Sequence, residues 1–85
     1  MSKRYIEAIL KAKNNIIELL ESLNVVFSNI KTKFRIKCDS EKEANIISDK
    51  IDNVIYSCFN YKNVKKLRRF AYYNGVLYMK FKHMV

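Results

Sequence analysis

The 85-residue chain has no proline and only one glycine. No stretch has linker composition, so residues 1–85 are expected to form a single domain. A single glycine excludes the glycine-rich loops that cradle phosphates. No apolar run is long enough for a signal sequence or a membrane span, so we expect a cytoplasmic, intracellular protein with no membrane partner.

The residues that most often carry chemistry are scarce. Cys38 and Cys58 have no CxxC spacing and cannot form a disulfide framework, so both are expected to be small buried hydrophobes. The only histidine, His83, stands two residues from the C-terminus, where it makes a poor base or metal ligand. We therefore expect a non-enzymatic protein with no catalytic residues, no metal and no cofactor.

Acidic side chains are few and unevenly placed. The 17 Lys and Arg residues outnumber the 8 Asp and Glu residues, and the net charge of +9 indicates a polyanionic partner or surface. All the acidic residues fall in two predicted helices or their caps, and none lies in segments 25–38 and 60–85. The segments predicted to form a sheet therefore carry the whole positive excess.

The first helix is predicted from Ser2 to Leu23 by apolar residues at three- and four-residue steps. Ser2 is expected to cap its start, and Asn24 is the expected left-handed terminating residue. The predicted core stripe consists of Ile6, Ile9, Leu10, Ile16, Ile17, Leu20 and Leu23.

The second helix is predicted from Asp39 to Phe59. Ser40, with Glu43 three residues later, forms a capping box at its start. Asp49 and Asp52 are expected on its solvated face. The predicted buried stripe consists of Ala44, Ile47, Ile51, Val54, Ile55 and Cys58.

Extended structure is predicted after each helix. Segment 25–38 is predicted to be extended because four basic residues alternate with the residues between them from Lys31 to Cys38, and a turn near Asn29–Ile30 would make a short hairpin. In segment 65–82 Gly75 follows Asn74, and Asn-Gly is the strongest hairpin signal because both turn residues take φ > 0. The predicted fold is α+β in the order α-β-β-α-β-β, or α-β-α-β-β without the first strand: two amphipathic helices packed on one face of a three- to four-stranded antiparallel sheet.

A two-residue Asn74–Gly75 loop also predicts the register of the last two strands. Tyr73 then faces Val76, and Arg69 faces Lys80, which sets like charges against each other. Because strand side chains alternate, one face carries Phe70, Tyr72, Leu77, Met79 and Phe81, with Arg68 at its rim. The other face carries Leu67, Arg69, Ala71, Tyr73, Val76, Tyr78, Lys80 and Lys82.

This second face is basic, and it should align with the alternating cations of segment 25–38. Cations would bind phosphates, and the tyrosines could stack on bases or ribose. The residues expected to bind nucleic acid or another partner are Lys31, Lys33, Arg35, Lys37, Lys65, Lys66, Arg69, Tyr73, Tyr78, Lys80 and Lys82.

Three interpretations of the basic face remain open. It contacts nucleic acid, with RNA favoured, or a nucleoprotein complex; it docks on an acidic protein surface; or its lysines only solvate an open sheet. Solvation explains well why lysines are present on this face. It explains poorly why acidic residues are absent, because an ordinary solvated surface carries charges of both signs. Pairing of sheet edges in a homodimer or heterodimer is a further expectation.

The stretch from Lys33 to Lys82 reads KFRIKCDSEKEANIISDKI and, further on, KKLRRFAYYNGVLYMKFK. Its strand ends directly at the Asp39–Ser40–Glu41 cap, and a basic hairpin follows the helix. In these features, and in the Ala44/Ile47 spacing, the chain resembles the first part of the Pcc1 family, small subunits of the KEOPS tRNA-modification complex. The resemblance implies a non-catalytic subunit that dimerises through strands and helices, docks on a kinase-like partner and supports tRNA handling. A small phage or viral inhibitor is the alternative that the short, basic, Asn- and Ile-rich composition suggests.

Overall fold

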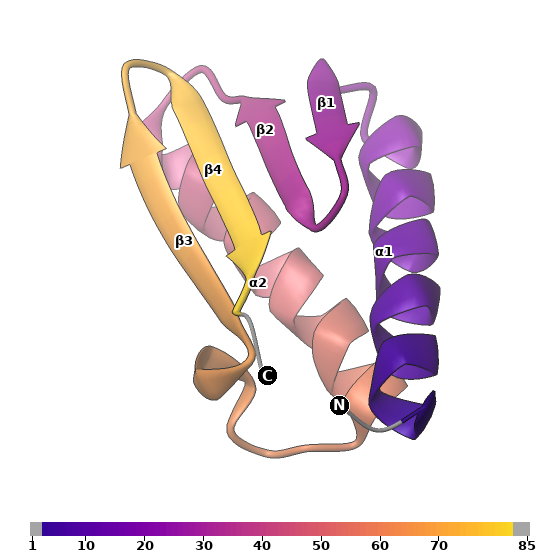
Figure 1. The fold of residues 1–85 in the computed structure, drawn as a ribbon. Coiled ribbons are helices and arrows are strands. Elements are labelled where there is room, and N and C mark those ends of the chain that lie inside the picture. Colours follow the sequence, from indigo (N-terminus) through magenta and orange to yellow (C-terminus); the bar gives the residue numbers. More distant parts are fainter. Residues whose placement is uncertain (1–2, 83–85) are drawn as a thin grey trace.

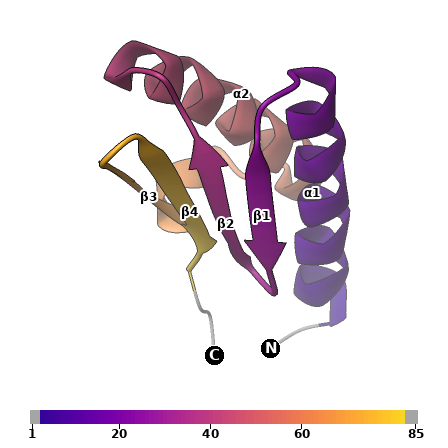
Figure 2. The same ribbon diagram turned by 90° about the horizontal axis from the view of Figure 1, so that it is seen from above.

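The computed structural model describes residues 3–82, so the predicted cap at Ser2 and the histidine at position 83 lie outside the described residues. The elements are α1 (Lys3–Ser22), β1 (Phe27–Ile30), β2 (Lys33–Lys37), α2 (Glu41–Phe59), a 3₁₀ turn η1 (Val64–Lys66), β3 (Arg68–Tyr73) and β4 (Val76–Phe81). The strands form one antiparallel sheet in the order β1-β2-β4-β3. Figure 1 and Figure 2 show α2 crossing behind this sheet and α1 running beside β1. The predicted α+β fold is confirmed.

Helix α2 begins at the predicted capping box. The backbone N–H of Glu43 donates to Ser40 Oγ at 3.1 Å, and Glu43 Oε2 accepts from the N–H of Asp39 at 3.2 Å. These bonds satisfy donors that would otherwise be left open at the helix start. The helix ends where Asn60 takes a left-handed conformation with φ 52° and donates its N–H to the carbonyl of Tyr56.

Helix α1 follows the predicted span, but the predicted core stripe is partly wrong. Ile6 and Leu10 are 45% and 53% exposed, whereas Ala12, Ile16 and Leu20 are fully buried. The apolar arc of this helix is wider than the arc that contacts α2 and the sheet. The helix is rotated about its axis relative to the predicted orientation. The small Ala12 therefore takes a buried position, and the larger Ile6 and Leu10 remain at the surface.

The second hairpin has the predicted register. Asn74 and Gly75 both have positive φ, 50° and 76°, and Arg69 pairs with Lys80. The predicted turn of the first hairpin is wrong, because β1 continues through Ile30 and the chain reverses at residues 31–32, with Lys31 at φ 54°.

The core lies between the helices and the inner face of the sheet. Central strands β2 and β4 supply its most buried strand residues, which are Phe34, Ile36, Leu77, Met79 and Phe81. Leu67, predicted for the basic face, is instead buried in this core. The 3₁₀ turn η1 causes the difference: it ends with the N–H of Leu67 bonded to the carbonyl of Val64, so the strand alternation begins only at Arg68.

Candidate nucleic-acid interface

The sheet side turned away from the helices, called the outer face below, gathers most of the predicted binding residues. Lys33 of β2 pairs directly with Lys80 of β4, and Lys80 pairs on its other side with Arg69 of β3. We call these three side chains the cation row. All three are exposed, and no acidic residue occupies an outer-face position of the four strands.

The hydrogen-bonding pattern brings Lys33 and Lys80 especially close. The adjacent pair Thr32–Phe81 carries a backbone bond, from Phe81 N–H to Thr32 O at 3.1 Å. Hydrogen-bonded pairs recur at every second position from there, and at the other end of the strand Cys38 N–H donates to Gly75 O at 2.9 Å. Lys33 and Lys80 therefore occupy a non-hydrogen-bonded pair, in which Cα atoms lie about 4.5 Å apart and side chains are nearest. The sheet imposes this approach on two like charges.

A second line of cations runs along β2. Arg35 follows Lys33 on the outer face, and its guanidinium lies 5.8 Å from the centre of the Tyr78 ring on β4. This distance allows a weak cation–π contact. Lys37 continues the line opposite Val76. The cations thus form two arms that meet at Lys33, with the Tyr78 ring in the angle between them.

A hollow of about 280 Å³ opens where the two arms meet. Ala71 faces Tyr78 across the strands, and its methyl group leaves the space open. The other outer-face residues that line the hollow are Lys33, Arg35, Arg69, Tyr78 and Lys80. We call it the basic hollow.

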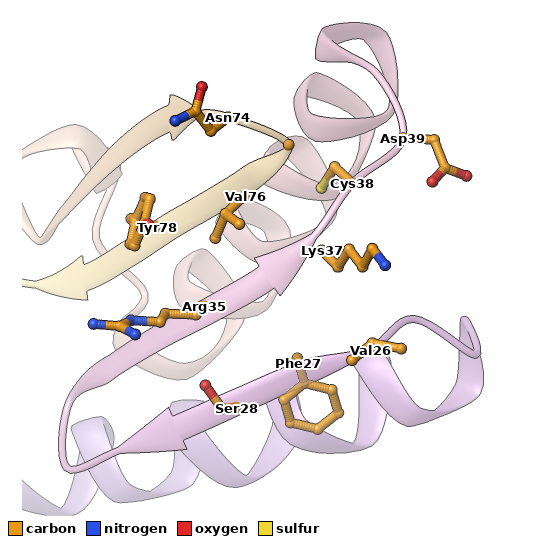
Figure 3. Close-up of a pocket in the computed structure, with 11 residues that line it drawn as sticks. Val26, Phe27, Ser28, Arg35, Lys37, Cys38, Asp39, Asn74, Val76 and Tyr78 are labelled. Carbon is orange, nitrogen blue, oxygen red and sulfur yellow. The ribbon is translucent and has the colours of Figure 1, made fainter.

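A larger hollow of about 540 Å³ lies toward the Asn74–Gly75 turn. Figure 3 shows Arg35 and Tyr78 at one end of it, with Lys37 and Asp39 toward the other. The remaining lining is mixed in polarity and consists of Val26, Phe27, Ser28, Cys38, Asn74, Gly75 and Val76. We call it the mixed hollow.

Four predicted binding cations lie outside this arrangement. Lys31 lies in the β1–β2 turn, and Lys65 and Lys66 lie in η1. Lys82 follows β4, and with Lys66 it lines a separate hollow that also contains Tyr5 and Tyr61. Tyr73, by contrast, lies on the outer face and is 66% exposed. The structure therefore concentrates the predicted site on β2, β3 and β4.

An ion pair that the sequence did not predict connects β3 to α2. Arg68 Nε and Nη2 donate to the two carboxylate oxygens of Asp52 at 2.8 and 2.7 Å. The expected solvated position of Asp52 is wrong, since its side chain is only 24% exposed and that of Arg68 is 15% exposed. This pair holds Arg68 on the inner side of the sheet, while the neighbouring Arg69 stays free for the cation row.

The thiols lie away from the outer face. Cys38 is buried, and Cys58 is partly buried and accepts a 3.5 Å contact from the side-chain amide of Asn15. Burial raises the pKa of the Cys38 thiol, with a further upward contribution from Glu43. Within residues 3–82 no cluster of His, Cys, Asp and Glu side chains is placed to hold a metal ion.

Comparison of the chain with protein-family models, with curated proteins and with solved structures finds no match. The resemblance to the Pcc1 family stays a prediction, as does pairing of the sheet edges between two copies. No helix in the described part of the chain combines the length and the apolar character needed to cross a membrane.

Proposed function

We propose that this chain is a non-enzymatic binding domain whose outer face contacts the phosphate backbone of a nucleic acid, with RNA favoured. The cation row is the observation that supports this most directly. Three like charges lie side by side across three strands with no acidic side chain among them. Such pairing destabilises a free sheet, and a bound polyanion would offset the repulsion.

The tyrosines favour RNA over a purely phosphate-binding role. Tyr78 stands between the two arms of cations, and Tyr73 lies on the same face near the hairpin turn. Aromatic rings beside cations are the means by which proteins stack on the unpaired bases that are common in RNA.

Purification from the native host, with and without nuclease, tests the proposal. We expect nucleic acid to co-elute with the protein and nuclease to remove it. A protein partner that remains bound after nuclease treatment would contradict the proposal and would favour docking on an acidic protein surface.

A charge-reversal variant separates the same two outcomes. Arg69→Glu with Lys80→Glu places two carboxylates at exposed positions in the cation row, so it should abolish nucleic-acid retention. Loss of a protein pull-down with nucleic-acid retention unchanged would identify the acidic-protein interpretation instead. The urea unfolding curve of the variant shows whether the fold survives the exchange.

A further inference from the structure

The two hollows of the outer face share a common wall. Arg35 and Tyr78 line both of them, so this pair stands between the basic hollow and the mixed hollow. The two residues face each other in a non-hydrogen-bonded position, which keeps the guanidinium and the ring together. The hollows therefore adjoin each other and differ in chemistry.

The basic hollow has the chemistry of a phosphate site. Lys33, Arg69 and Lys80 border it, and Arg35 supplies a further cation from the dividing wall. Figure 3 shows the side chains of Arg35 and Lys37 extending in opposite directions along β2, so the Arg35 guanidinium points away from Lys37. Ala71 adds no polar atom and leaves space for a tetrahedral anion.

The mixed hollow has the chemistry of a base site. It is a shallow hollow of about 540 Å³ that is open to solvent. Tyr78 and Val76 offer an apolar surface, whereas Ser28, Asn74 and Asp39 offer donors and acceptors at its margin. Apolar walls with a few polar groups suit a planar heterocycle that has hydrogen-bonding edges.

We propose that the outer face binds a single strand of nucleic acid along its cations, with one phosphate in the basic hollow, neighbouring phosphates at the other outer-face cations, and an adjacent unpaired base against Tyr78 in the mixed hollow. This inference rests on the proposed function and specifies its substrate class. A duplex keeps its bases stacked and paired, so it can offer phosphates to the cation row but no base to the mixed hollow. The face therefore prefers a single strand to a duplex of equal length.

Fluorescence anisotropy with a labelled single-stranded RNA and with a hairpin duplex of the same sequence tests this preference. Tyr78→Leu removes the ring and keeps an apolar side chain, while Tyr78→Phe keeps the ring and serves as the matched control. We expect Tyr78→Leu to weaken single-strand binding about tenfold, as loss of one base–aromatic stack does, with the salt slope and duplex binding unchanged. Tyr78→Phe should stay within about twofold of wild type, because the phenyl ring preserves the stack.

A second variant fills the base site without changing charge. Ser28→Phe places a ring at an exposed β1 position that lines the mixed hollow, so it should reduce single-strand binding and spare duplex binding. Equal affinity of wild type for single strand and duplex, or full single-strand affinity in Tyr78→Leu, would overturn the inference. Absence of salt-dependent binding to either nucleic acid would instead remove the proposed function itself.

Discussion

Lys33 and Lys80 face each other across β2 and β4 in a position where the backbone brings side chains closest, and no carboxylate lies between them. Arg69 adds a third cation on the far side of Lys80. The free protein therefore bears a repulsion that two consecutive strand pairings impose. This repulsion at exposed positions is the main support for the binding role proposed above.

The first prediction concerns the stability that the protein loses through repulsion within the cation row. Lys80→Gln removes the member that has a like charge on both sides, so it should raise the free energy of unfolding by about 1 kcal/mol at low salt. Urea unfolding at low and high salt measures this. Because salt screens the repulsion, the advantage of the variant should shrink as ionic strength rises.

Lys50→Gln is the matched control for that experiment. Lys50 is exposed on α2, so the exchange changes net charge equally without touching the cation row. A stabilisation of the same size in both variants would mean that net charge alone is responsible. Repulsion between Lys33 and Lys80 would then not account for the stabilisation.

The second prediction concerns the ion pair between Arg68 and Asp52. Asp52→Asn removes the carboxylate that accepts two charge-assisted hydrogen bonds in a largely buried position, so we expect a loss of about 2 kcal/mol in the free energy of unfolding. Asp49→Asn, at an exposed position of the same helix, should change stability by less than about 0.5 kcal/mol. Equal effects of the two variants in urea unfolding would contradict a structural role for the pair.

The third prediction concerns the Asn74–Gly75 turn. A Cβ at Gly75 would lie 3.6 Å from the carbonyl oxygen of Cys38, which is an ordinary contact. Gly75→Ala should therefore cost only the conformational strain of its φ of 76°, about 1–2 kcal/mol. Asn74→Gly, at a position that also has positive φ, is the control and should change stability by much less. A neutral Gly75→Ala in thermal unfolding would contradict this account of the turn.

The fourth prediction concerns thiol reactivity. Cys38 is 3% exposed and its pKa is raised, first by burial and then by Glu43, so both access and ionisation disfavour its reaction. We expect iodoacetamide to modify the partly exposed Cys58 quickly and Cys38 only when the chain unfolds. Mass spectrometry of the Cys38→Ala and Cys58→Ala variants assigns the two phases, and fast labelling of Cys58→Ala would contradict the prediction.

The same pKa shift predicts a dependence of stability on pH. The thiol of Cys38 ionises in the unfolded chain near its ordinary value of 9.0, before it ionises in the folded protein. The unfolded state then binds fewer protons, so stability falls as pH rises through and above that value. The fall should be smaller in Cys38→Ala, as urea unfolding at a series of pH values would measure.

Local patterns predicted the second hairpin well because turn chemistry and register are set by adjacent residues. Asn74 and Gly75 supply the two positive φ angles, and the pairing of Arg69 with Lys80 follows by counting outward. The capping box at Ser40 is equally local. The first hairpin gave a weaker signal, because its turn holds no glycine and begins at Lys31.

Long-range features could not be derived in the same way. The pairing of β2 with β4 joins two hairpins separated by α2, and it creates the contact between Lys33 and Lys80. The sequence did hold one indication of the strand order. Each edge strand has a polar residue on its inner face, Asn29 in β1 and Arg68 in β3, and edge strands tolerate such side chains better than central strands do. The partner of Arg68 on α2 depends on how that helix crosses the sheet.

The salt dependence of RNA binding shows whether the outer-face cations contact phosphates. The outer face carries five cations, which are Lys33, Arg35, Lys37, Arg69 and Lys80. If each contacts one phosphate of a single strand, a plot of log K against log salt has a slope of about −3.5. Neutralising the cation row with Lys33→Gln, Arg69→Gln and Lys80→Gln should bring the slope to about −1.4, because about 0.7 is lost with each contact.

The decisive comparison is with a variant of equal net charge that changes only exposed helix residues, Lys11→Gln with Lys42→Gln and Lys50→Gln. We expect this control to keep a slope near −3.5 between about 50 and 200 mM salt, while the row variant loses most of it. Equal slopes in the two variants, or binding of wild type that ignores salt, would contradict a nucleic-acid interface on the outer face.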